Sequence, residues 1–188
     1  RGSNIIGVPM FLATALAFHF GETRLLVPIL ALGAAATFLL EIVRRHDLRQ
    51  SLLQTLMTLA GVLYVGFPAG FLIGLRALPG NSGLLWVLLI LFVTWGTDSF
   101  AYIGGRLWGK TKLAPTLSPK KTREGAVVGV IGGMVPALVL LALTQSFSTA
   151  ALVFVVLGPF VAIIGDLFES ALKRFFEIKD SHVPGLDI

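Results

Sequence analysis

The chain has 188 residues, of which 55% are hydrophobic and only 13% charged, and its mean hydropathy is +0.87. A soluble domain usually carries about 25% charged residues, so this composition excludes an ordinary soluble domain and predicts a polytopic membrane protein. The chain has no cysteine and only three histidines, which excludes disulfide frameworks and zinc–thiolate sites and disfavours zinc-dependent hydrolysis. Because the bases lie beside apolar segments, the formal charge of +5 favours anionic lipid headgroups or phosphorylated substrates, with no nucleic-acid partner.

Six apolar segments follow one another along the chain. The first is short and is interrupted by Gly7 and Pro9, which predicts either a shortened transmembrane span or a re-entrant segment. The other five are long enough to cross a bilayer. In chain order, the segments are Ile5–Phe20, Leu25–Val43, Leu52–Leu75, Leu84–Tyr102, Gly125–Leu143 and Ala150 to about Lys173. Arg1–Ser3 resembles the remnant of a tag or linker and is left out of the fold prediction.

The distribution of bases orients these segments. Three Lys or Arg residues lie at 44–50, six at 106–123 and three at 173–179, whereas the intervening connections hold one, one and none. Heavily basic loops stay on the cytoplasmic side of a membrane. We therefore expect an all-α, multi-pass transmembrane helical bundle of about six spans. A polar site would lie at the cytoplasmic helix ends, and a bacterial inner membrane is the expected location.

The last apolar segment ends in acids, a serine and bases. On a helix, Asp166, Ser170 and the pair Lys173/Arg174 fall at i, i+4 and i+7/i+8, so they share one face. A carboxylate within a membrane-grade apolar run is costly unless it is paired, bound to metal or hydrated. Glu169 stands four residues before Lys173, and an ion pair between them is the favoured interpretation.

A second acid, Asp98, closes the Leu84–Tyr102 segment and precedes a polar connection over 104–124 that is rich in bases and hydroxyls. Such a connection can hold a polyphosphate through charge-assisted hydrogen bonds, although a basic loop that touches anionic lipid fits its composition equally well. Asp98 and Asp166 are candidate ligands for a hard divalent cation. The alternative is that each pairs with a neighbouring base.

Two blocks of this sequence resemble the phosphatidate cytidylyltransferase (CDP-diacylglycerol synthase) family. One runs from Gly165 through the Ser-x-x-Lys-Arg pattern at 170–174, Lys179-Asp180 and Pro184-Gly185. The other runs from Thr97-Asp98-Ser99 through Ser118-Pro-Lys-Lys-Thr-Arg-Glu-Gly125. The likeness covers about residues 84–185. It divides the chain into N-terminal transmembrane segments over 1–83 and a catalytic region over 84–188 with a cytoplasmic loop at 104–124.

The resemblance implies a reaction in which CTP and phosphatidate, a membrane lipid, give CDP-diacylglycerol and pyrophosphate with Mg²⁺, alone or with a second cation. It implies direct in-line attack, without a covalent enzyme intermediate. By the same resemblance, Asp166, Ser170 and Lys173 are catalytic, and Asp166 and Asp187 bind metal. The implied substrate-binding residues are Asp98, Ser99, Ser118, Lys120, Lys121, Arg123, Arg174, Lys179 and Asp180.

The chain departs from the family pattern after Pro184-Gly185, where the His-Gly-Gly and Asp-Arg elements are missing and Leu186-Asp187-Ile188 follows. We expect these residues to be parts of a longer protein joined across an absent loop, with a chain break within 181–186. Small-residue helix faces are compatible with a homodimer.

Two other functions remain open from the sequence. A CTP-dependent polyprenol or phytol kinase would share the topology and the nucleotide. An ion-coupled transporter that uses Asp98 and Asp166 as a relay fits the interrupted segments, but both acids lie toward one membrane face instead of the midplane.

Overall fold

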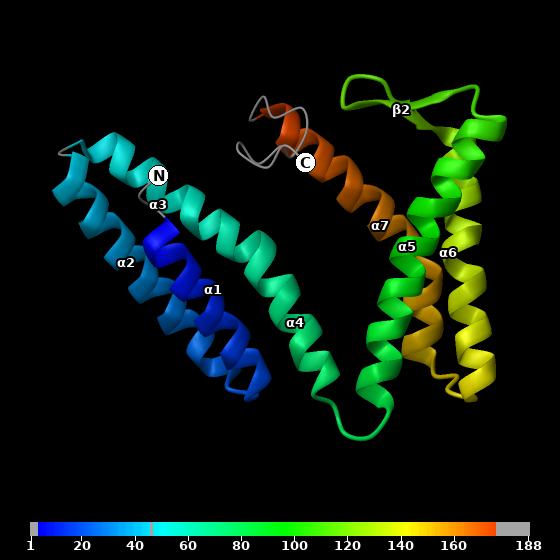
Figure 1. Ribbon diagram of the computed structural model, residues 1–188, viewed down its shortest axis with the longest axis horizontal. Coiled ribbons are helices and arrows are strands. Elements are labelled where there is room, and N and C mark those ends of the chain that lie inside the picture. The colour runs from blue at the N-terminus through cyan, green and yellow to red at the C-terminus, as the bar shows by residue number, and fades with distance from the viewer. Residues whose placement is uncertain (1–3, 46, 176–188) are drawn as a thin grey trace, which may run out of the picture. The chain divides into compact units, whose positions relative to one another are not determined.

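The computed structural model describes residues 4–45 and 47–175 (Figure 1). Lys179, Asp180 and Asp187 lie outside the described residues, as does the predicted break within 181–186. The described chain is almost entirely helical, which confirms the predicted all-α membrane fold. It divides into two compact units, of which the first reaches Val87 and the second begins at Leu88.

The first unit contains α1 (Asn4–His19), a 3₁₀ turn (Thr23–Leu25) and α2 (Leu26–Arg45). A long helical run then follows, composed of α3 (Leu48–Gly61), the π-helical turn η2 (Val62–Gly66) and α4 (Phe67–Arg76). The Asp47 carboxylate caps the start of this run by accepting the backbone N–H groups of Arg49 and Gln50. Such a cap satisfies amide groups that have no partner within the helix.

Buried hydroxyls explain how polar residues are accommodated in the apolar helices of the first unit. Thr14, Thr37 and Thr55 are buried. Each donates a hydrogen bond to the carbonyl four residues earlier, at 2.8, 2.7 and 2.9 Å respectively. Since each of these three hydroxyls is satisfied within its own helix, none of them needs a partner from the apolar surroundings.

The second unit contains α5 (Ser82–Trp108) from Leu88 onward, the hairpin strands β1 (Lys112–Ala114) and β2 (Ser118–Thr122), α6 (Arg123–Thr144) and α7 (Thr149–Phe175). Glycines allow α5 and α6 to approach closely. A Cβ on Gly133 would come within 2.2 Å of Thr97 Oγ1, and one on Gly129 within 2.7 Å of the Thr97 carbonyl oxygen. Small residues at a helix contact are the usual means of close packing in membranes. The buried apolar core around this contact consists of Leu89, Val93, Ala137, Leu141, Ala151 and Val155.

Five helical stretches within the described residues are long and apolar enough to cross a membrane: Thr23–Arg44, Leu48–Arg76, Ser82–Trp108, Arg123–Thr144 and Thr149–Phe175. The segment Ile5–His19 is apolar but shorter. These stretches agree with the six predicted segments and with the predicted weakness of the first. Which side faces the cytoplasm stays a prediction, as does the functional division at 83/84.

Two local features differ from the sequence prediction. The polar connection contains a short antiparallel hairpin, in which β1 pairs with β2. In addition, α5 continues past Tyr102 to Trp108, so Asp98 lies within the helix and not at its end. In this extension Gly104 is buried against Val128 of α6, where a Cβ would come within 2.6 Å of the Val128 side chain, so α5 and α6 stay closely packed here.

Candidate functional site

A cavity of about 590 Å³ lies in the second unit, among α5, the hairpin, the start of α6 and α7. Its walls combine carboxylates, bases and hydroxyls with apolar groups, and the apolar groups make up the larger share of the lining surface. The lining residues are Asp98, Ala101, Tyr102, Gly105, Arg106, Leu113, Ser118, Lys120, Lys121, Thr122, Ala126, Ile163 and Asp166. Pockets that mix apolar walls with a few convergent polar groups are the usual binding sites of proteins.

The two cavity acids come from equivalent depths of two helices. Asp98 lies 16 residues after the start of α5 and Asp166 lies 17 residues after the start of α7. At a rise of 1.5 Å per residue, both stand about 25 Å along helices that run in the same direction through this unit. Asp98 is within electrostatic range of Asp166, Glu169 and Lys121. The sequence prediction that the two acids share one face of the protein is therefore matched by their common cavity.

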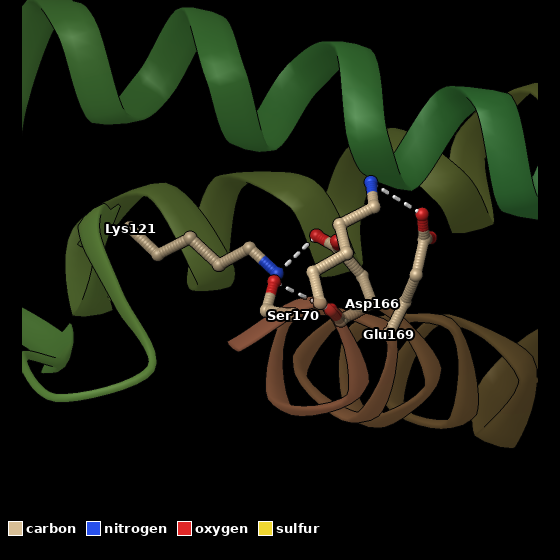
Figure 2. Close-up of polar contacts among 5 residues, drawn as sticks. Lys121, Asp166, Glu169 and Ser170 are labelled. Carbon is tan, nitrogen blue, oxygen red and sulfur yellow. Dashed lines mark hydrogen bonds and ion pairs between the residues drawn. The ribbon is translucent and has the colours of Figure 1, made fainter. Parts of the chain in front are cut away.

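Lys121 extends from β2 toward α7 and forms an ion pair with the Asp166 carboxylate (Figure 2). The Lys121 side chain is 24% exposed and that of Asp166 is 44% exposed. The alternative that Asp166 pairs with a base is thus observed, although the base comes from the hairpin and not from α7 itself. The same ammonium group lies where it can also meet an anion entering the cavity.

The hairpin is held close to α5 by Thr122 and by glycines. The Thr122 hydroxyl accepts the Gly125 N–H at 3.1 Å and so caps α6. A Cβ on Gly109, just after α5, would come within 2.7 Å of the Thr122 methyl group, and one on Gly105 of α5 within 3.1 Å of the Thr122 hydroxyl oxygen. Larger residues at these glycines would push the hairpin away from α5, and Lys120 and Lys121 would move with it.

The structure brings together part of the predicted site. Five of the predicted residues line the cavity: Asp98, Ser118, Lys120, Lys121 and Asp166. Five other predicted residues that are described, Ser99, Arg123, Ser170, Lys173 and Arg174, are not among its lining residues.

Ser170 and Lys173 have local partners on α7. The Ser170 hydroxyl donates to the Asp166 backbone carbonyl at 2.9 Å. Lys173 forms an ion pair with Glu169 at 2.6 Å, which confirms the structural pairing predicted for Glu169 (Figure 2).

Eight lining residues were not among the predicted site residues, and Tyr102 and Arg106 carry the two largest polar side chains among them. They follow Asp98 at i+4 and i+8 on α5, which is the spacing of residues on one helical face. The same rule that joined Asp166 to Ser170 would have found Tyr102 within the predicted segment, and it would have found Arg106 had the helix been predicted to continue beyond Tyr102.

The oxygen donors of the cavity fit a hard divalent cation. Asp98 and Asp166 offer two carboxylates, and Lys121 shows that a cationic group is accommodated beside Asp166. Within residues 4–45 and 47–175, no group of three His, Cys, Asp or Glu side chains could hold a metal ion. Mg²⁺ is commonly held by one or two carboxylates together with substrate phosphates and water, so two acids are sufficient.

The model of the cytidylyltransferase family matches residues 3–185 of this chain. The chain belongs to this cytidylyltransferase family. Among curated relatives, the phosphatidate cytidylyltransferase of Staphylococcus saprophyticus is 37% identical over 71% of this chain and 50% of its own length. The Bacillus subtilis enzyme of that name is 39% identical over 66% of the chain and 46% of its own length. The Haemophilus influenzae enzyme of that name is 41% identical over 55% of the chain and 38% of its own length. The chain spans about half the length of the curated relatives it matches, or less.

Proposed function

We propose that this cytidylyltransferase-family chain forms the nucleotide-binding part of an enzyme that transfers a cytidylyl group from CTP to phosphatidate. The products would be CDP-diacylglycerol and pyrophosphate. The observation that carries the proposal is the cavity in which Asp98 and Asp166 of two apolar helices face the basic hairpin. The relatives are named phosphatidate cytidylyltransferases, which supports the choice of phosphatidate as acceptor.

In this reaction, a phosphate oxygen of phosphatidate forms a bond to the α-phosphorus of CTP, and the bond from that phosphorus to the bridging oxygen of the β-phosphate breaks. Pyrophosphate leaves with the bonding electron pair. Negative charge is spread over the phosphoryl oxygens throughout, so catalysis depends on positioning and on electrostatic stabilisation. A bound Mg²⁺ would neutralise part of this charge.

The cavity supplies both requirements from its own side chains. Lys120, Lys121 and Arg106 provide three cationic groups that would bind the triphosphate through charge-assisted hydrogen bonds. Asp98 and Asp166 would hold the cation. Lys121 pairs with Asp166 in this structure, and its ammonium group would move from that carboxylate to a phosphate oxygen when the nucleotide binds.

The apolar part of the cavity fits the lipid substrate. Leu113, Ala126 and Ile163 line it together with the polar groups. The acyl chains of phosphatidate would stay among the apolar helices while its phosphate reaches the bases. The basic hairpin supports a cytoplasmic position for this face, because positively charged loops stay on that side of a membrane.

The test is an assay with purified protein in lipid nanodiscs, Mg²⁺, phosphatidate and CTP labelled at the α- or γ-phosphate. Label from the α-phosphate is expected in a lipid product, together with release of pyrophosphate, and Asp166→Asn is expected to abolish both. Transfer of the γ-label to a lipid alcohol would contradict the proposal and favour a CTP-dependent kinase. Neither product, with ion flux in liposomes, would favour a transporter.

A further inference from the structure

Glu124 makes a set of contacts that the proposed reaction does not use. It lies in the first turn of α6, and its carboxylate accepts the backbone N–H groups of Lys110 and Thr111. The N···O distances are 3.1 Å to Lys110 and 3.1 and 3.2 Å to Thr111. Glu124 is not among the residues that line the cavity. Its carboxylate therefore links the start of α6 to two residues that lie 13 and 14 positions earlier in the chain.

These contacts close the base of the hairpin. The Arg123 N–H donates to the Thr111 carbonyl at 2.9 Å, beside the two amide groups that Glu124 binds. Strand β2 runs directly into α6, so its end is fixed by the helix. Strand β1 does not follow a helix directly, because residues 109–111 separate its start from the end of α5. Glu124 and Arg123 together fix that start to the same helical turn.

The hairpin is expected to be only weakly stable without the helices around it. Its strands have three and five residues, and the register shifts between Lys112 and Ala114. An isolated two-stranded hairpin is at best marginally stable in water. The position of β2 relative to α7 thus depends on how the base of the hairpin is held.

A carboxylate suits this position for two reasons. It can accept from two successive amide groups at once, and charged acceptors form stronger hydrogen bonds than neutral ones. A negative charge in the first turn of a helix is also favoured by the helix dipole. Glutamine at 124 would keep one carbonyl acceptor but would lose the charge and the second oxygen.

We infer that Glu124 is a positioning residue that sets the placement of Lys120 and Lys121 for binding the triphosphate of CTP. This inference rests on the proposed function, because the placement of those two lysines affects CTP binding only if the cavity receives a polyphosphate. Glu124 touches neither substrate. It acts through the hairpin, by holding the Lys110–Thr111 segment against the start of α6.

The experiment compares wild type, Glu124→Gln and Glu124→Ala in nanodiscs, with Glu22→Gln as the matched control. Glu22 is also a glutamate with a close polar partner, Arg24 at 2.7 Å, but it lies in the first unit. For Glu124→Ala we expect the KM for CTP to rise about tenfold, as when a charge-assisted contact is lost. The KM for phosphatidate and kcat are expected to stay within about twofold, because Glu124 does not line the cavity and is inferred to act only through the lysines that bind the triphosphate. Glu124→Gln is expected to fall between wild type and Glu124→Ala, and Glu22→Gln to match wild type.

Hydrogen exchange supplies a second readout that needs no substrate. The amides of Lys110 and Thr111 are expected to exchange faster in both Glu124 variants than in wild type, with no change across α5. An unchanged KM for CTP in the variants, a fall in kcat alone, or unchanged protection of the two amides would overturn the inference. If Glu124→Ala does not fold, Glu124→Gln decides by the same two readouts. Wild type that forms no lipid-linked CMP would instead overturn the proposed function, so the two failures are distinguishable.

Discussion

The ion pair between Lys121 and Asp166 gives the most direct quantitative prediction. Replacing Lys121 with methionine removes the cation but keeps most of the side-chain length. Exposed ion pairs contribute about 0.2–1 kcal/mol, whereas removing one partner of a buried pair costs about 3–5 kcal/mol. With side chains 24% and 44% exposed, this pair lies between those limits and toward the lower one. We expect Lys121→Met to lower the free energy of unfolding by about 1–2 kcal/mol.

A loss of this size is measurable by thermal unfolding in detergent, followed by tryptophan fluorescence. In a chain of this length, about 1 kcal/mol shifts Tm by about 2–4 °C, so the expected decrease is about 2–8 °C. Lys120→Met is the matched control, because Lys120 is the adjacent base, is exposed and forms no ion pair with Asp166 in this structure. Its Tm is expected to stay close to that of wild type.

A double-mutant cycle with Asp166→Asn tests the pairing itself. If the two side chains stabilise each other, the double variant loses less stability than the sum of the single variants, by about 1 kcal/mol. Additivity within about 0.3–0.5 kcal/mol would refute the reasoning, as would equal effects of Lys120→Met and Lys121→Met.

Three further predictions concern the same unit. Gly133→Ala is expected to destabilise the protein by about 1–3 kcal/mol, because its Cβ would meet Thr97 Oγ1 and the Val93 carbonyl oxygen. Gly165→Ala is the matched control, because its Cβ would have nothing within 4 Å, and it is expected to leave the stability of the protein unchanged or to raise it. Equal decreases of Tm in Gly133→Ala and Gly165→Ala would contradict the packing argument. Thr122→Ala is expected to cost about 1 kcal/mol through loss of the α6 cap, with recovery in Thr122→Ser; a serine variant as unstable as the alanine variant in thermal unfolding would contradict this role. Asp98→Asn is expected to raise the Mg²⁺ concentration that gives half-maximal activity by roughly tenfold or more, because even the loss of a residue that only supports a metal ligand has an effect of that size. An unchanged Mg²⁺ dependence would show that Asp98 is not a ligand.

The helices and the meeting of the two acids were predictable from the sequence. Apolar length marked the spans, and loop charge placed Asp98 and Asp166 toward one membrane face. Their nearly equal distances from the starts of α5 and α7 provide the physical reason that they share one cavity.

The hairpin and its contacts were not predictable in the same way. Pro115 and Pro119 and the lack of alternating apolar residues obscure the strands in the sequence. The contact from Glu124 to Thr111 depends on how the chain folds back, which no local pattern records. Ser170 shares a helical face with Asp166, as predicted, but its hydroxyl is bonded to the backbone of its own helix. Helical periodicity determines the direction of a side chain but does not determine its partner.

The lengths of α5 and α7 make membrane thickness a variable of the proposed reaction. Each helix has 27 residues, or about 40 Å, whereas the hydrocarbon core of a bilayer measures about 30 Å. Since Asp98 and Asp166 stand about 25 Å along these helices, they would lie near the boundary where acyl chains give way to headgroups. In a thicker bilayer the carboxylates would sink into hydrocarbon, and in a thinner one the phosphate of the lipid would withdraw from them. The acyl-chain length of the host membrane would thus set how well the reacting phosphate and the two acids meet.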